Sequence, residues 1–283
     1  MHPSISVNVF AKRLSIFVFC ANVFCAPNWV CAQAPDSNLP DAPIAAQAAV
    51  KDSGDSPSNR DVSWRSLPKD FLRDQKDIWL FPVQLAKGRH WLPTLGIAGG
   101  TAGLIVADPH VMPYFRDHAR NLDRLNDVFD PSITAAEVVA VPASFMIAGY
   151  AQHEPYQVKT SLLAAEAYAD SAVVDLVFKA ITRRERPADV PAGASFSHTF
   201  FNGGKSPFKG SSFPSGHAAG AFSVATVVAS RYRTHRWVPW VMYSFATAIS
   251  FSRVTQSAHF PSDVFLGAAL GYTITRYEVL RPR

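Results

Sequence analysis

The sequence SRVTQSAHFPSDVFLGAALGYTIT, residues 252–275, joins the end of one apolar segment to the whole of the next. Pro261 stands just before the second segment, and proline is favoured in the first turn of a helix. That segment is rich in helix formers, and its small-residue patch, Gly267–Gly271, allows close packing of two helices. The stretch therefore predicts a helix-to-helix turn inside a packed helical protein.

Five more apolar segments of the same kind precede this one. The six segments are Leu92–Ala107, Ile133–Ala151, Ser161–Phe178, Ala218–Ser230, Trp237–Ser252 and Val264–Thr275. Small residues and helix formers dominate them. Prolines stand between them at positions 109, 131, 187, 214 and 261, where helix boundaries are expected. The sequence therefore predicts an all-α fold, a helical bundle of about six core helices.

The composition is compatible with two settings for this bundle. Hydrophobic residues make up 48% of the chain and charged residues 17%, whereas roughly 25% of a typical soluble domain is charged. A membrane-spanning helix needs about 20 apolar residues, and most of the six segments are shorter. Either the helices are embedded in a membrane, or they form a compact bundle that is soluble or associated with a membrane surface.

The N-terminus has the features of an export signal. Lys12 and Arg13 flank the apolar, uncharged stretch Leu14–Val30, and an A-x-A site follows at residues 32–34. This order predicts a signal peptide at residues 1–34, with an uncleaved membrane anchor as the alternative. All three cysteines of the chain lie within it. The mature chain would therefore have neither a cysteine nucleophile nor a cysteine metal site.

Three regions follow the predicted signal. Residues 35–63 are rich in Pro, Ala, Ser and Asp, which is typical of a flexible spacer. Residues 64–91 mix aromatic and charged side chains and are expected to form a short amphipathic helical segment. Residues 92–283 are expected to form the helical functional domain. The net charge is +5 and the basic residues are scattered, so no nucleic-acid partner is indicated.

The first of three chemically distinctive motifs is KAITRRERP, residues 179–187. Lys179 and Arg186 are seven residues apart, which predicts that they share one side of a helix that ends at Pro187. Both cations would then project from the end of that helix. Arg183 and Arg184 lie between them and are interpreted as solvated helix charges.

The second motif, PSGH at residues 214–217, precedes an uncharged run. Ser215 or Gly216 can begin a helix there, and the free N–H groups of a helix start bind phosphate. Glycine also permits a close approach of an oxyanion. His217 would lie in the first turn and face the same space.

The third motif is the most specific of the three. Arg253 ends one helix, and Asp263 lies four residues after His259. A carboxylate at this position can accept the Nδ1–H of the imidazole, which leaves Nε2 free to act as a nucleophile. Cations, a helix start, two histidines and an orienting acid together suit phosphoryl transfer, in which charge on the equatorial oxygens must be stabilised.

The three motifs resemble those of the type 2 phosphatidic acid phosphatase superfamily, which also contains bacterial non-specific acid phosphatases and vanadium haloperoxidases. That family's pattern is K-x6-R-P, then P-S-G-H, then S-R-x5-H-x3-D, and this chain matches every fixed position. The resemblance covers the helical region from about residue 92 to the C-terminus. It implies a helical bundle with the active site at one end.

The resemblance also implies a role for each matched residue. It implies that His259 attacks phosphorus and forms a phosphohistidine, that Asp263 orients His259, and that His217 protonates the departing alkoxide and then activates water. Five residues would hold the phosphate oxygens: Lys179, Arg186, Ser215, Gly216 and Arg253. The resemblance implies no metal and no other cofactor.

The expected function is that of a metal-independent histidine phosphatase. It would hydrolyse phosphate monoesters or pyrophosphates, those of a membrane lipid in preference to soluble phosphoesters. A vanadate-dependent haloperoxidase and a non-specific acid phosphatase are the alternatives, although haloperoxidases are usually much longer. The export signal places the protein in the cell envelope, membrane-embedded or membrane-associated, with its site on the periplasmic or external side.

Overall fold

The computed structural model describes residues 60–118, 126, 129, 131–203 and 211–282. The predicted signal peptide at residues 1–34, and the predicted spacer as far as residue 59, lie outside these described residues.

All regular secondary structure in the described part of the chain is helical, which confirms the predicted all-α bundle. The α-helices are α3 (Leu67–Trp79), α4 (Phe81–Ala86), α5 (Trp91–Asp117), α7 (Pro131–Ala151), α8 (Pro155–Thr182), α9 (Gly216–Arg231), α10 (Val238–Thr255) and α11 (Pro261–Ile274). A 3₁₀ turn, Pro187–Asp189, follows α8, and a π-helical turn, Thr275–Val279, follows α11. Each of the six predicted segments lies within one of these helices, to within one residue at an end.

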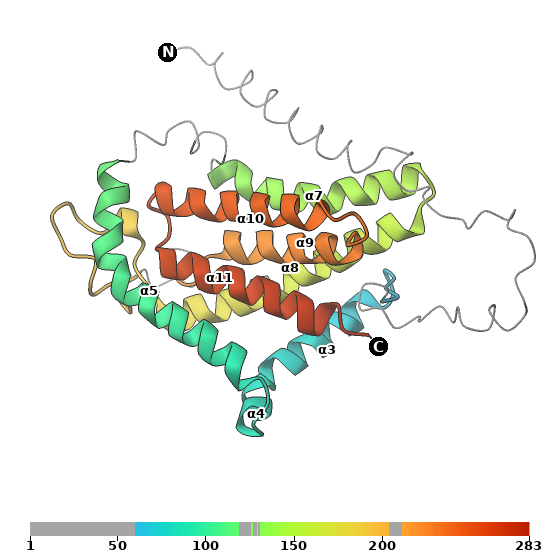
Figure 1. Cartoon of the computed structure of the whole chain (residues 1–283), viewed down its shortest axis with the longest axis horizontal. Helices are drawn as coiled ribbons and strands as arrows, with labels where there is room; N and C mark the ends of the chain where they lie inside the picture. Colours follow the sequence, from blue (N-terminus) through green and yellow to red (C-terminus); the bar gives the residue numbers. More distant parts are fainter. Residues whose placement is uncertain (1–59, 119–125, 127–128, 130, 204–210, 283) are drawn as a thin grey trace, which may run out of the picture.

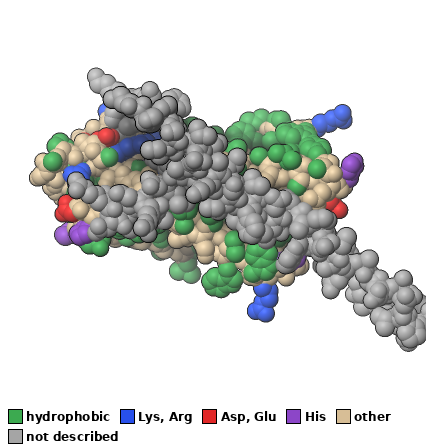
Figure 2. All heavy atoms as spheres, turned by 90° about the horizontal axis from the view of Figure 1, so that it is seen from above, with side chains coloured by type: hydrophobic (Ala, Val, Ile, Leu, Met, Phe, Trp, Pro, Cys, Tyr) green, Lys and Arg blue, Asp and Glu red, His purple; other side chains and the backbone are tan. Residues whose placement is uncertain are grey.

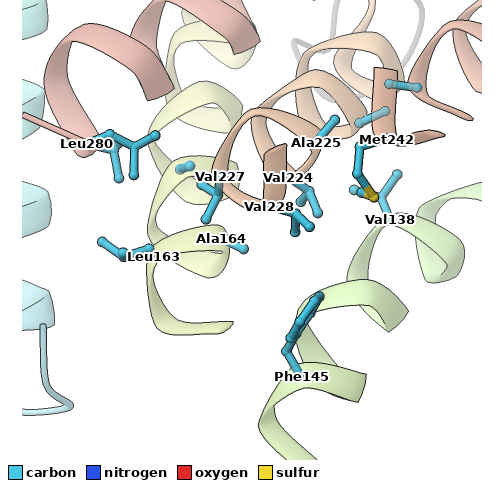
Figure 3. Packing of buried hydrophobic residues seen from close by; sticks show 14 of the residues in the cluster. Val138, Phe145, Leu163, Ala164, Val224, Ala225, Val227, Val228, Met242 and Leu280 are labelled. Carbon is cyan, nitrogen blue, oxygen red and sulfur yellow. The ribbon is translucent and has the colours of Figure 1, made fainter. Parts of the chain in front are cut away.

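Helix α9 forms the centre of the bundle. It packs against α7, α8, α10 and α11, and 12 of its 16 residues are buried. Figure 3 shows Val224, Val227 and Val228 of this helix in one cluster with Leu163 of α8 and Phe145 of α7. A helix that is apolar all round belongs in a protein core. The buried position of α9 fixes where its N-terminus, and hence the PSGH motif, lies.

Two glycines bring α11 against α9. A Cβ atom at Gly267 would lie 2.4 Å from the carbonyl oxygen of Ser215, and one at Gly271 would lie 2.1 Å from the carbonyl oxygen of Ala219. No side chain fits at either position, so the two backbones touch. The predicted close packing at this patch is confirmed, and it places the start of α9 beside the start of α11.

Helix α5 runs along the outside of the bundle and packs mainly on α11 (Figure 1). Among the described residues it is the one helix long and apolar enough to cross a membrane, and only 17% of its most apolar window is buried. Apolar side chains are exposed in several patches on the face seen in Figure 2. The expectation that Pro109 marks a helix boundary is wrong. The helix continues because Met112, which is 0% exposed, packs with Phe115 on the bundle.

Helix α3 docks on α8 through charged side chains. Arg60 Nη2 lies 2.8 Å from Glu166 Oε1 of α8 and 3.2 Å from Asp70 Oδ2 of α3. Arg60 and Val62 are buried, so the last residues of the predicted spacer pack on the helical domain. Figure 1 shows α3 and α4 meeting α5 at one corner of the molecule.

Candidate active site

Lys179 lies in the last turn of α8, but Arg186 does not lie on this helix. The helix ends at Thr182, and Arg183 adopts a left-handed conformation with φ 42°. The prediction that Lys179 and Arg186 share a helix that runs to Pro187 is therefore wrong. Residues after Thr182 leave the helix because their backbone pairs with a distant loop: Glu185 donates to the Thr199 carbonyl, and the Arg184 carbonyl accepts from Ser212.

Arg186 nevertheless acts on the same histidines as Lys179, from an extended segment. The positive charges of Lys179 and Arg186 both lower the pKa values of His217 and His259, so all four groups lie within electrostatic reach of one another. Lys179 thus acts on the two histidines from the last turn of α8, and Arg186 does so from the segment after the helix rather than from the same helix face.

The PSGH motif begins α9, as predicted. Ser215 is the N-cap residue, and its Oγ accepts a hydrogen bond from the Ala218 N–H at 3.5 Å. Its own N–H donates to the Asp263 carbonyl at 2.9 Å, which ties the start of α9 to α11. The first free amides of the helix point out of its N-terminus, where the helix dipole favours an anion.

Gly216 lets this helix start approach an ion pair on α8. Lys179 Nζ lies 2.7 Å from Asp175 Oδ2. A Cβ atom on Gly216 would lie 2.8 Å from Asp175 Oδ2 and 3.2 Å from Lys179 Nζ. A pocket of about 200 Å³ opens here, and Asp175, Lys179, Gly216 and His217 contribute to its lining. Val138, Tyr168, Ala172 and Gly220 complete the lining.

His259 is 3% exposed and is held by two acceptors. Its Nδ1 lies 2.7 Å from the Ser212 carbonyl oxygen and 3.6 Å from Asp263 Oδ2. The expectation that Asp263 takes the Nδ1–H directly is corrected, because the Ser212 carbonyl is the nearer acceptor. A carbonyl only accepts, so Nδ1 carries the proton and Nε2 carries the free electron pair, as the sequence predicted.

Arg253 is 1% exposed and lies in the last turn of α10. Its guanidinium donates to the Ser252 hydroxyl at 3.0 Å and to the Phe129 carbonyl. Its positive charge lowers the pKa of His217. The third predicted cation therefore lies within electrostatic reach of His217, as Lys179 and Arg186 do.

The two histidines are close and are both uncharged at neutral pH. Their ring centroids are 6.5 Å apart. Burial, followed by the neighbouring positive charges, lowers the pKa of His217 to about 3. Burial also lowers the pKa of His259, although Asp263 acts in the opposite direction. An uncharged His259 with its electron pair on Nε2 is a competent nucleophile.

Asp263 is charged at neutral pH although it is fully buried. Burial raises the pKa of this carboxyl, but the interaction with His259 and the charge of Arg184 more than offset that effect and hold the pKa below its ordinary value. A buried carboxylate next to Nδ1 stabilises the positive charge that an imidazole gains when it attacks through Nε2.

Four residues near the site were missed or misjudged from the sequence. Arg184 was predicted to be a solvated helix charge, but it is 1% exposed and contacts Asp263, so that interpretation is wrong. Asp175 lies four residues before Lys179, a helical spacing that signals an ion pair. Asp108 and Ser212 contact the site from distant positions in the sequence, and no local pattern points to them.

Residues 160–281 match the family model described as the PAP2 superfamily. Over 64 residues, this chain is 38% identical to a lipid A 1-phosphatase from Porphyromonas gingivalis. The matched segment is 22% of this chain and 14% of that protein. The chain is also similar to the first transmembrane PAP2 type phosphatidylglycerolphosphate phosphatase from Bacillus subtilis, seen in a crystal structure. The TM-score is 0.40 with 19% identity, covering 73% of this chain and 94% of that one.

Proposed function

We propose that this chain, of which residues 160–281 match the PAP2 superfamily, is a phosphatase that removes a phosphate group from a membrane lipid. One observation carries the proposal. The N-terminus of α9 lies beside Lys179, and the charges of Lys179, Arg186 and Arg253 act on two uncharged histidines, one of which has a buried carboxylate beside Nδ1. Cations and amides stabilise the charge on a phosphoryl group, and a histidine supplies the nucleophile.

In the proposed reaction His259 Nε2 attacks phosphorus while the bond to the leaving oxygen breaks. The electron pair of that bond passes to the leaving oxygen, which takes a proton from His217. The phosphohistidine is then hydrolysed by a water molecule that gives a proton back to His217. Asp263 balances the positive charge on the His259 ring during the first step. Lys179, Arg186, Arg253 and the amides after Ser215 would hold the phosphate oxygens, so the proposal involves no metal and no cofactor.

Substrate binding prepares His217 for its role as an acid. In the free site, burial and the neighbouring cations hold the pKa of His217 at about 3, so it carries no proton. A phosphate dianion bound between the cations and His217 offsets their charge and raises the pKa of the imidazole. His217 would thus take up a proton together with the substrate, where the leaving group needs it.

The preference for a lipid rests on the surroundings of the site. The lining of the pocket beside His217 includes Val138, Tyr168 and Ala172, which suit the non-phosphate part of a substrate. Helix α5 has the length and composition of a membrane span and exposes Leu92 and Val106. The segment of similarity to a lipid A 1-phosphatase agrees with a lipid substrate.

Activity on a substrate panel tests this proposal. Purified protein is given phosphatidic acid, phosphatidylglycerol phosphate, a prenyl pyrophosphate, a lipid A phosphate and soluble phosphomonoesters, and inorganic phosphate is measured. We expect release from at least one lipid and loss of release in His259→Ala. Near wild-type release from His259→Ala would contradict the mechanism, and release from soluble esters alone would contradict the lipid substrate.

We also propose that the site faces the periplasm or the exterior. The chain has cysteines only within residues 1–34, so a cysteine at Ala258, between Arg253 and His259, gives a single reactive position once the signal is removed. An impermeant thiol reagent added to intact cells should label Ala258→Cys. Labelling only after lysis would place the site on the cytoplasmic side. Arg233→Cys lies in the exposed turn between α9 and α10. Its labelling reports whether the opposite end of α9 is accessible to the same reagent.

A further inference from the structure

Arg184 is buried beside His259 and Asp263 but does not line the pocket described above. Its Nη1 donates to Asp263 Oδ1 at 2.6 Å and to Ser262 Oγ at 2.7 Å. Its Nε donates to Thr199 Oγ1 at 3.0 Å. Arginine presents its donors in a rigid fork, and here that fork is directed at the residues that begin α11.

Asp108 of α5 holds the other side of the same guanidinium. Arg184 Nη2 donates to Asp108 Oδ2 at 2.7 Å. Asp108 also accepts from the Ser262 hydroxyl at 2.5 Å and from the Ser262 N–H at 3.2 Å. It is 0% exposed, although few residues of α5 are buried. An ionisable side chain that is buried in a helix with the composition of a membrane span usually serves a function.

Aromatic rings seal this contact from water. The Arg184 guanidinium carbon lies 3.8 Å from the ring centroid of Phe260 and 4.5 Å from that of Phe200. Cation–π contacts are favourable, and the exclusion of water strengthens the ionic contacts as well. The chain from Asp108 through Arg184 to Asp263 is therefore rigid and fully buried.

We propose that Arg184, anchored by Asp108, is a positioning residue that holds the Asp263 carboxylate opposite His259. The inference rests on the proposed role of His259 as the nucleophile. Arg184 occupies Asp263 Oδ1, and the Phe260 N–H donates to Oδ2 at 2.8 Å. With both oxygens anchored, Oδ2 stays 3.6 Å from His259 Nδ1, where the ring becomes positive as Nε2 bonds to phosphorus. Arg184 stabilises this arrangement without touching the phosphate.

The same contact makes the geometry of the site depend on α5. Apart from Asp108, the buried residues of this helix are Thr101 and Met112. Asp108 therefore links the outer helix to the residues around His259 by hydrogen bonds, next to Met112, which packs with Phe260. Displacing α5 would remove Asp108 from Arg184, which would keep its contacts with Asp263, Ser262 and Thr199. It would also free the start of α11 from the Asp108 contacts.

Three variants test the proposal. Arg184→Met alone leaves Asp108 and Asp263 buried without their counter-charge, which can prevent folding. The double variant Asp108→Asn with Arg184→Met also removes the carboxylate of Asp108, so it is expected to fold. In this variant Asp263 lacks its hydrogen bond from Arg184. Arg183→Met removes the exposed neighbouring cation and is the matched control. Phosphate release gives kcat, and sulfate, a tetrahedral dianion, reports the anion site by calorimetry.

We expect kcat of the double variant to fall on the order of 100-fold, which is the scale for a misplaced catalytic group. Sulfate affinity should stay at the wild-type value, because Arg184 lies outside the phosphate pocket. The Arg183→Met control should behave as wild type. A double variant with wild-type kcat would overturn the proposal, and so would a loss of sulfate binding equal to the loss of kcat.

A second substitution covers the case in which the double variant does not fold. Arg184→Lys keeps the positive charge but offers no fork, so it cannot anchor Asp108 and Asp263 as arginine does. Its kcat should fall, and the His259 Nδ1–H resonance should shift relative to wild type. An unchanged resonance with unchanged kcat would overturn the proposal. If His259→Ala is inactive while the Arg184 variants have normal activity, the proposed role of Arg184 is refuted and the proposed function is not. Activity in His259→Ala would refute the proposed function itself.

Discussion

The protonation of His217 depends on whether an anion occupies the site. Burial and four neighbouring cationic or titratable groups lower its pKa to about 3 in the free protein. A bound dianion raises that pKa, so anion binding and proton uptake are linked. Because the pKa is higher in the complex, affinity must increase as pH falls.

We therefore predict that sulfate binds more tightly at pH 5 than at pH 8, by about tenfold if the pKa in the complex rises to about 6. Sulfate itself remains a dianion across this range, so its own protonation does not contribute. Calorimetry at both pH values measures the effect. In His217→Asn the difference should largely vanish. An equal pH dependence in wild type and variant would show that another group binds the proton.

Gly216 gives a second prediction for a single residue. A methyl group at this position would meet Asp175 Oδ2 at 2.8 Å and Lys179 Nζ at 3.2 Å, both at the ends of flexible side chains. These side chains can move without disturbing the backbone. Gly216→Ala should therefore fold normally but lose at least tenfold in kcat/KM, about 1.4 kcal/mol, because Lys179 would be displaced from the proposed phosphate site.

Thermal unfolding and phosphate release by Gly216→Ala, side by side, check this expectation. Gly103→Ala in α5 is the matched control, because nothing lies within 4 Å of an added Cβ there. A variant with full activity would show that Lys179 does not need its observed position. A variant that fails to fold would show that the backbone, rather than the two side chains, absorbs the clash.

At the scale of helices, the contact between α9 and α11 determines where the two histidine motifs meet. A Cβ atom at Gly271 would lie 2.1 Å from the backbone oxygen of Ala219, which cannot rotate away. Gly271→Ala must therefore separate the helices. We predict a loss of about 2 kcal/mol of unfolding free energy, within the range for overpacked cores. Denaturant titration measures it, with Gly96→Ala as an exposed helical control.

The anchoring of α3 gives a prediction with a defined pH dependence. Arg60 pairs with Glu166 and Asp70, and Asp170 lies in the same buried group. Burial raises the pKa of Asp170 to about 7 and also raises the pKa of Glu166, which Arg60 partly offsets. A raised carboxyl pKa contributes stability at low pH, and that contribution is lost as pH rises towards the folded-state value.

Arg60→Met should therefore destabilise the fold by about 3 kcal/mol, and more at pH 8 than at pH 5.5. At the lower pH the carboxyls can stay protonated, whereas at the higher pH they are buried as unpaired charges. Melting temperatures at both pH values test this, with the exposed Arg65→Met as control. A loss of stability that is the same at both pH values would contradict the role of Arg60 as a counter-charge.

Features that depend on neighbouring residues in the sequence can be predicted from it, whereas features that depend on distant contacts need the whole fold. Apolar segments, prolines and the PSGH motif act locally, so the helices and the start of α9 were predicted. Arg184 was misjudged because its burial depends on Asp108, 76 residues away, and on a backbone turn after Thr182. The Ser212 carbonyl was missed because every residue has a carbonyl, and only the fold brings this one to His259, 47 residues away.

The relation of the whole molecule to a membrane rests on α5. Its 27 residues would extend roughly 40 Å at 1.5 Å per residue, enough to cross a hydrocarbon core of about 30 Å. Val106, which is 72% exposed, lies well inside the helix, whereas Leu92, at 84%, lies next to its start. If α5 spans a membrane, a charge at Val106 is placed in the hydrocarbon and a charge at Leu92 can reach the interface.

Val106→Arg should then weaken membrane insertion by about 3 kcal/mol, while Leu92→Arg should have little effect, because the cost of a charge depends on depth. In water the two exposed positions are equivalent, so the folded protein should tolerate both. The membrane-bound fraction after carbonate extraction, together with the melting temperature in detergent, separates these cases. Equal extraction of both variants and wild type would mean that α5 lies against the bundle outside the bilayer, and that the lipid reaches the site from the membrane surface.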